Sequence, residues 1–336
     1  MRKILLSAIV ACGVLAAVPA MATYTGSLYT TDFITHHVYR TDVVNNICGG
    51  LIDLAGQLPG ADGIIFNPLD DSRLLIGGQL SNAIYEVGVV PGGYSTFSSQ
   101  PIVNGSLLLA FKPGDPVPGK PGGVTPEGII LTSGYEGPVP NSLALVGVSS
   151  HNVDNRVISG MSMVSGMAVR NSILYASDGN EFGGGRLFTI NLATNTGTLL
   201  PVAGSTADMH ALWLDNYTGH LFAVGGRIIQ EIDLDAVGGP AVVRSWDCTS
   251  LIPPFPWLDH FDGIHSDDDG NFFAAVNSGP MVYLDLKAAT PTPIMLKDFG
   301  SGLDDVACGK TPIPEPSTLL LAGMALLGGA LLRKRS

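Results

Sequence analysis

The sequence is poor in positive charge, which removes one broad class of partners. Its 336 residues include 17 Lys and Arg against 29 Asp and Glu. Five of these cations lie at the two ends of the chain, so residues 23–311 carry 12 cations and 28 anions, a net charge of −16. A body this acidic repels phosphate groups, and bulk charge therefore excludes nucleic acid and anionic lipid headgroups as ligands.

The sequence also lacks the motifs that define common catalytic sites. It contains no G-x-S-x-G nucleophile elbow, no H-E-x-x-H zinc motif, no P-loop, and no G-x-G-x-x-G after an expected strand. The glycines at 183–185 fall in an expected hairpin turn. No nucleophile–base pair can be recognised from residue spacing, so no motif supports catalysis.

Long amphipathic helices are absent from the pattern of residues 23–311. The chain instead contains 43 Gly and 23 Pro, and only 14% of its residues are charged. This composition is typical of short strands joined by many turns, so we expect an all-β domain.

The first 22 residues, MRKILLSAIVACGVLAAVPAMA, have the layout of a secretory signal peptide. Two cations precede an apolar run, and Ala20 and Ala22 complete an A-x-A cleavage site. We predict cleavage after Ala22 and export of the body, residues 23–311.

The C-terminal segment, residues 312–336, has three consecutive parts. These are Pro314, Glu315 and Pro316, then an uncharged apolar span at 317–332, then Arg333, Lys334 and Arg335. As a helix the span would measure roughly 24 Å, at the short end for crossing a membrane. The basic cluster is a membrane-stop signal that stays in the cytoplasm, so we predict a transmembrane helix over 317–332.

This order of motif, span and basic cluster resembles the PEP-CTERM sorting signal of Gram-negative bacteria. The resemblance covers about the last 25 residues. It implies that an exosortase, a membrane-embedded cysteine transpeptidase, recognises the motif, removes the tail and passes the body toward the cell surface. The inner membrane is then a transient partner, and the resemblance implies nothing about the activity of the body.

The body contains a repeated three-strand pattern. A short apolar strand that follows Asp-Gly or its equivalent is succeeded by a turn and two further strands. Clear copies begin at Asp62, Ser165, Asp208 and Asp262, and a weaker copy begins at Pro126. A copy from 302 has a first strand only, whereas the strands from residue 27 lack a first strand.

A repeat divided between the two ends of a domain is typical of a circular β-propeller, which has no free sheet edge. We therefore predict an all-β, six-bladed propeller over residues 23–311, in which N-terminal strands complete the C-terminal blade. The long spacing between Asp62 and Glu127 leaves a seventh blade open as an alternative. A two-sheet sandwich would not require the divided repeat.

Three cysteines remain after removal of the signal peptide. Cys48 and Cys248 each precede an Asp-Gly pair by 14 residues, so they occupy equivalent places in separate blades, too far apart to bridge. We predict a disulfide between Cys48 and Cys308, both in the closing region, with one thiol left over.

The predicted register places carboxylates and imidazoles where the innermost strands begin, around the central channel. They are Asp62, Glu127, Asp208, His210, Asp262, His265, Asp304 and Asp305. Such a cluster could hold a divalent metal or perform acid–base chemistry, as in six-bladed lactonases and gluconolactonases, an analogy of architecture only. The favoured interpretation is that the acidic residues form turns before Gly, which does not explain His210 and His265.

Two other patterns are weaker metal candidates. Residues 266–273 space Asp267, Asp269 and Asn271 like part of a Ca²⁺ loop but lack its distal Glu, so a hairpin turn is favoured. His36 and His37 are expected in an alternating strand with one ring facing in and the other out.

Two functional hypotheses remain. The favoured one is a non-catalytic surface or matrix protein, with no cofactor, whose propeller binds exopolysaccharide or another surface protein. The alternative is a secreted metal-dependent hydrolase or lactonase with its site in the channel.

Overall fold

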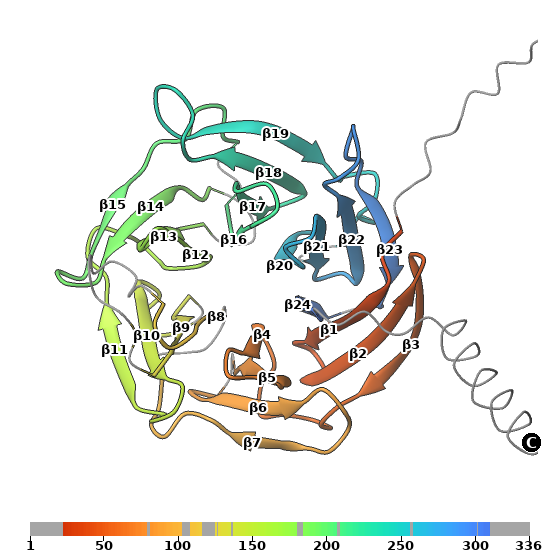
Figure 1. Ribbon diagram of the computed structural model, residues 1–336, viewed down its shortest axis with the longest axis horizontal. Helices are drawn as coiled ribbons and strands as arrows, with labels where there is room; N and C mark the ends of the chain where they lie inside the picture. Colours follow the sequence, from red (N-terminus) through yellow and green to blue (C-terminus); the bar gives the residue numbers. More distant parts are fainter. Residues whose placement is uncertain are drawn as a thin grey trace, which may run out of the picture.

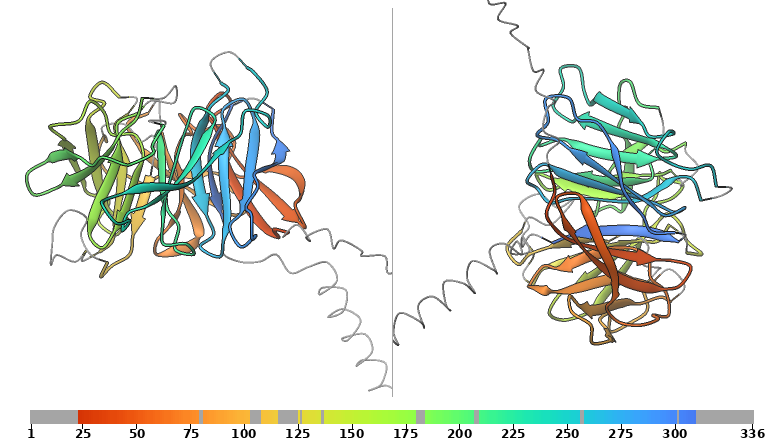
Figure 2. Two further views of the ribbon diagram at one scale, coloured as in Figure 1. Left: turned by 90° about the horizontal axis from the view of Figure 1, so that it is seen from above. Right: turned by 90° about the vertical axis from the view of Figure 1, so that its right-hand side faces the viewer.

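The computed structural model describes residues 23–78, 81–102, 108–115, 125, 127–135, 137–179, 184–206, 209–255, 258–300 and 302–309. These residues form a ring of six sheets, each with four antiparallel strands, around a central channel (Figure 1). Seen from the side, the ring is a disc, and its strands run across the thickness of this disc (Figure 2). The predicted six-bladed β-propeller is confirmed, and the seven-bladed alternative is wrong.

The six blades are numbered I to VI here, and their strands are given from the channel outward. Blade I contains β24 (Leu303–Cys308), β1 (Gly26–Asp32), β2 (His37–Val44) and β3 (Ile47–Asp53). Blade II contains β4 (Ile64–Asn67), β5 (Asp70–Gly77), β6 (Ile84–Gly88) and β7 (Tyr94–Thr96), and blade III contains β8 (Leu108–Phe111), β9 (Ile129–Ser133), β10 (Ser142–Gly147) and β11 (Val153–Val157).

The second half of the ring repeats this arrangement. Blade IV contains β12 (Met167–Arg170), β13 (Ile173–Ser177), β14 (Leu187–Asn191) and β15 (Thr196–Leu199). Blade V contains β16 (Ala211–Leu214), β17 (Leu221–Gly225), β18 (Ile228–Asp233) and β19 (Ala241–Asp247), and blade VI contains β20 (Phe261–Ser266), β21 (Asn271–Val276), β22 (Pro280–Asp285) and β23 (Ile294–Asp298).

Blade I closes the ring by joining the two ends of the body. Its innermost strand β24 pairs with β1, with Leu28 opposite Cys308 and Thr30 opposite Val306. The segment of β1 from Leu28 to Asp32 therefore has a neighbouring strand on its inner side, which removes an exposed sheet edge. The predicted closure is confirmed.

Blade III differs from the sequence prediction in its innermost strand. The copy beginning at Pro126 was expected to start on the channel, but Ile129–Ser133 is the second strand, β9. The inner position belongs to β8, an apolar run that lies inside the apparent insertion. The long spacing before Glu127 therefore holds β7 and β8, the strands of two ordinary blades, rather than an additional blade.

Turn residues explain how the hairpins form. Asn45 and Asn46, between β2 and β3, both have positive φ, at 52° and 64°. Asn171 and Ser172 do the same between β12 and β13, at 51° and 65°. Two successive positive φ values give the turn whose twist matches antiparallel strands, and Asn tolerates this conformation better than most residues.

The hydrophobic core lies between neighbouring blades. The largest group joins blades V and VI, where Phe222, Phe261 and Phe272 are each at most 1% exposed. Burial of each such ring stabilises the fold by about 2 kcal/mol relative to an exposed ring. Adjacent blades thus stabilise each other, and the inner strands are held in fixed positions around the channel.

Both terminal segments lie outside the described residues. They include the predicted signal peptide at 1–22, the sorting motif Pro314, Glu315 and Pro316, the span at 317–332, and Arg333, Lys334 and Arg335. None of the described residues belongs to a helix long and apolar enough to cross a membrane.

Candidate functional site

A hydrogen-bonded group of carboxyls and imidazoles lies where the inner strands begin. Nε2 of His210, just before β16, is 2.6 Å from Oδ1 of Asp262 in β20. Asp304 in β24 is hydrogen-bonded to Asp262 and interacts with Asp62, just before β4. Four consecutive blades, V, VI, I and II, thus contribute to a single group, made of Asp62, His210, Asp262 and Asp304 and called the channel cluster below.

Asp262 accepts one further hydrogen bond from within blade VI. When the Asn277 amide is oriented to satisfy both of its neighbours, its nitrogen donates to Oδ2 of Asp262 at 3.1 Å. Its oxygen then accepts from Nε2 of His260 at 3.0 Å. The Asp262 carboxylate therefore has donors on both oxygens, which is the arrangement that stabilises its charged form.

The two carboxyls of the cluster have opposite pKa shifts. Burial raises the pKa of Asp304 well above its ordinary value, and the nearby charges of Asp62 and Asp262 raise it further. Burial would also raise the pKa of Asp262, but hydrogen bonds from Asp304 and His210 outweigh it and hold this pKa below its usual range. The opposite shifts favour a protonated Asp304 that donates its hydrogen bond to an ionised Asp262.

Asp305 lies deeper in the channel and has a structural contact. Its Oδ2 accepts a hydrogen bond from the backbone N–H of Ile64 at 3.1 Å, which ties blade I to blade II. Burial raises the pKa of Asp305 to about 7, although the backbone N–H donors of Val306 and Ile64 lower it in part.

Glu127 and Asp208 were also predicted to lie around the channel. Glu127 is outside the channel, where its carboxylate accepts from the backbone N–H of Ser150 at 2.6 Å and from the Ser150 hydroxyl at 2.8 Å. The predicted position of Glu127 was wrong because β8, not β9, is the inner strand of blade III. Asp208 lies outside the described residues. Within the described part of the chain, no three His, Cys, Asp or Glu side chains are placed to hold a metal ion.

His265 was expected beside Asp262 but belongs to the opposite end of the channel. It is the fifth residue of β20, where its ring packs on Trp213 with 4.1 Å between centroids. Its Nδ1 lies 3.0 Å from Sγ of Cys308 at the end of β24. Asp262 and His265 are only three residues apart in sequence and were therefore expected to lie together. Three residues of an extended strand span about 10 Å, which is enough to place them at different ends of the channel.

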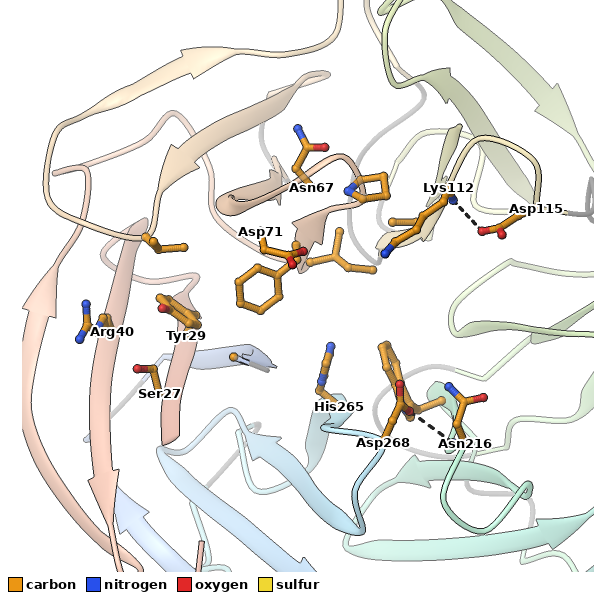
Figure 3. A pocket seen from close by; sticks show the side chains of 17 residues that line it. Ser27, Tyr29, Arg40, Asn67, Asp71, Lys112, Asp115, Asn216, His265 and Asp268 are labelled. Carbon is orange, nitrogen blue, oxygen red and sulfur yellow. Dashed lines mark hydrogen bonds between the residues drawn. The ribbon is translucent and has the colours of Figure 1, made fainter. Parts of the chain in front are cut away.

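A cavity of about 610 Å³ opens at this second end of the channel (Figure 3). Five blades contribute to its wall. Its aromatic side chains are Tyr29, Phe66, Trp213 and His265, and its charged or amide side chains include Arg40, Asn67, Asp71, Lys112, Asp115, Asn216 and Asp268. This volume is in the range of small-molecule binding sites, which combine apolar walls with a few placed polar groups.

Sequence reasoning missed this cavity almost entirely. Asp71, Lys112 and His265 point toward its centre from three different blades (Figure 3). Only His265 had been singled out, because the other lining residues are spread over strands and turns of five blades with no shared motif. The recurrence of polar residues just after each apolar inner strand was the available signal.

The predicted disulfide between Cys48 and Cys308 is wrong in this structure, where neither sulfur is in a disulfide. Cys48 is in the outermost strand of blade I and Cys308 is in the innermost, with β1 and β2 between them. Three strand spacings amount to about 14 Å, twice the reach of a disulfide. Cys248 is not in a disulfide either, and burial raises its pKa to about 12, so its thiol is unreactive at neutral pH.

The two weaker metal candidates have structural roles. Oδ1 of Asp267 accepts from the backbone N–H groups of Asp269 and Asn271 at 2.9 and 3.0 Å, and this confirms a hairpin turn between β20 and β21. His36 is in a turn with φ of 58°, not in a strand as predicted. His37 begins β2, and its Nδ1 pairs with Asp53 at 2.8 Å.

The fold and its channel define a six-bladed β-propeller. Comparison with known proteins indicates where the chain is sorted. Residues 312–335 match the PEP-CTERM protein-sorting motif. The chain is therefore exported and sorted toward the cell surface, with an exosortase as its sorting partner.

Solved structures support the fold alone. A chain in the crystal structure of the nidogen/laminin complex is 11% identical, with a TM-score of 0.59, over 85% of this chain and 98% of that one. A functionally unknown protein from Desulfotomaculum acetoxidans DSM 771 is 11% identical, with a TM-score of 0.48, over 84% of this chain and 81% of that one. A sequence search among curated proteins gives no significant match.

Proposed function

We propose that this exosortase-sorted propeller is a binding scaffold that associates with exopolysaccharide at the cell surface. The observation that carries the proposal is the 610 Å³ cavity at one mouth of the channel, which combines aromatic rings with carboxylate, amide and ammonium groups. A sorting route that ends at the surface brings the cavity into contact with extracellular polymer.

The scaffold is rigid where the ligand would bind. The lining residues lie in strands of five blades or in the turns that follow those strands, and the strands are fixed by burial between blades. A preformed site loses little conformational entropy on binding, so modest contacts suffice for useful affinity.

The alternative, a metal-dependent hydrolase or lactonase, has less support. The two histidines on which it depended lie at opposite ends of the channel, one against Asp262 and the other against Cys308. Two carboxyls of the channel cluster are also nearly inaccessible, with Asp62 only 5% and Asp304 only 2% exposed. A buried carboxyl of this kind holds strands together more readily than it reaches a substrate.

The proposal is tested with the processed protein recovered from the surface of its native host. Sedimentation with purified host exopolysaccharide should retain the protein, and added cavity-sized oligosaccharides from the same polymer should release it. Passage into the supernatant at every polymer concentration, with the protein folded by circular dichroism, would rule out the binding role.

A further inference from the structure

Two aromatic rings lie on opposite sides of the cavity. Phe66 is in β4 of blade II and Trp213 is in β16 of blade V, which is opposite blade II in a ring of six. Both side chains are partly exposed and line the cavity. Their ring surfaces are thus available to a ligand that enters along the channel axis.

Neighbouring rings fix the orientation of both surfaces. Tyr29 contacts Phe66 edge to face, with 5.4 Å between centroids. His265 packs on Trp213 with 4.1 Å between centroids, and its own position is set by the contact with Cys308. Aromatic rings held in fixed orientations favour binding of a ligand with flat apolar faces, because little side-chain entropy is lost on stacking.

Polar groups around these rings exclude a purely apolar ligand. Asp71 and Lys112 are exposed and point into the cavity (Figure 3). Asp268, from the turn after β20, also lines it, and its Oδ1 accepts from the backbone N–H of Asn216 at 3.3 Å. An apolar occupant would bury these groups without hydrogen bonds, at a cost of about 1–3 kcal/mol each.

The charge balance of the cavity disfavours an anionic ligand. Three carboxylates line it, those of Asp71, Asp115 and Asp268, whereas Lys112 is a single ammonium. The guanidinium of Arg40 is already paired with Asp42 at 2.8 Å. An added carboxylate or sulfate would face this excess of negative charge, so the cavity favours an uncharged ligand over an anionic one.

Sugar rings combine these requirements. A pyranose has C–H faces that stack on aromatic rings and a rim of hydroxyls that donate to carboxylates and accept from an ammonium. We infer that the cavity binds an uncharged oligosaccharide segment of about two or three rings, stacked between Phe66 and Trp213, with hydroxyls bonded to Asp71, Lys112 and Asp268. This inference rests on the proposed function and names the ligand class and the residues that select it.

The inference is tested with host exopolysaccharide that has been partly hydrolysed and separated by anion exchange into uncharged and acidic oligosaccharides. Each fraction is titrated into the processed protein by isothermal calorimetry. The expected result is one binding site for the uncharged fraction and at least tenfold weaker binding of the acidic fraction. Equal or preferential binding of the acidic fraction would overturn the inference.

Substitutions locate the site. Asp71→Asn and Lys112→Ala change exposed side chains and should preserve folding, yet each should weaken binding of the uncharged fraction about tenfold. Trp213→Ala should weaken it by at least as much. Asp70→Asn is the matched control, because Asp70 precedes Asp71 in β5 but does not line the cavity, and its affinity should equal that of the wild type.

The outcomes separate the two proposals. If the intact polymer binds but the Asp71, Lys112 and Trp213 variants bind it like the wild type, the cavity inference is wrong and the scaffold role stands. If neither the intact polymer nor any fraction binds the wild-type protein, both proposals are wrong.

Discussion

Tyr29 of β1 lies opposite Ala307 of β24, so one blade of the ring is assembled from the two ends of the body. The same residue also contacts Phe66 of the next blade. Ring closure and the wall of the cavity therefore depend on the same N-terminal strand, and damage to one should affect the other.

Deletion of residues 23–44 should abolish the soluble fold. It removes β1 and β2 and exposes the edges of β24 and β3, which would pair with other molecules. We expect a product that elutes in the void volume on size-exclusion chromatography and lacks a cooperative thermal transition. A chain that starts at Thr23 is the control, and a monomeric, cooperatively unfolding deletion variant would contradict the closure.

Stability should decrease as pH rises from about 4 to 7. Asp304 and Asp305 have raised pKa values in the folded state, that of Asp305 being about 7, against about 4 in the unfolded chain. The folded state therefore binds more protons in this window, and each group can contribute a slope of up to about 1.4 kcal/mol per pH unit. The stabilisation is complete below about pH 4 and is lost as pH approaches the folded pKa.

Asp304→Asn provides the measurement for that slope. An amide keeps the shape of the protonated carboxyl and does not titrate, so urea denaturation at half-unit pH steps should give a flatter profile than that of the wild type. Subtracting one pH profile of stability from the other cancels the contribution of every titrating group that the two proteins share. Asp71→Asn, at an exposed position, should reproduce the wild-type slope, and an unchanged slope in Asp304→Asn would show that Asp304 is ionised when folded.

Asp262 should have the opposite effect on the pH dependence of stability, and this effect should occur in acid. Its pKa is held below the ordinary value, so its contribution is present above about pH 4 and is lost as pH falls below that value. His210→Ala removes one of its hydrogen bonds and should lower the free energy of unfolding at pH 7 by about 1–3 kcal/mol. His37→Ala, whose partner Asp53 is at the exposed rim, should cost less, and equal losses would mean that burial adds nothing to the His210 contact.

The sequence predicted the ring well because the divided repeat is a direct consequence of how a propeller closes. Five of the six inner strands were located, including the isolated strand that became β24. The error at blade III arose because Pro-Glu-Gly-Ile-Ile imitates the Asp-Gly-Ile-Ile that begins β4, whereas β8 begins without that signal. Local similarity cannot separate the first strand of a blade from the second, since both are short and apolar.

The candidate site was less predictable, for a geometric reason. His210, Asp262 and Asp304 were expected to meet, and they do, because equivalent positions at the start of inner strands converge on the axis. Whether such carboxyls hydrogen-bond to one another or bind a ligand depends on their burial. Residue spacing along the sequence does not reveal that burial. The cavity residues, such as Asp71 at the start of β5 and Lys112 just after β8, come together through an arrangement of blades that only the three-dimensional structure defines.

The sorting motif gives a last prediction, on the fate of the chain. Pro314 and Pro316 lack backbone N–H groups and disfavour helix, so the motif should remain extended ahead of the apolar span at 317–332, where an exosortase can bind it. Alanine at Pro314, Glu315 and Pro316 should therefore leave an uncut chain in the inner membrane of the native host, detected by immunoblotting of membrane and surface fractions. Alanine at Ser317 and Thr318, just beyond the motif, is the matched control and should be processed like the wild type. If the motif variant still reaches the surface without its tail, recognition does not depend on Pro-Glu-Pro, and the segment acts as an ordinary membrane anchor that another protease removes.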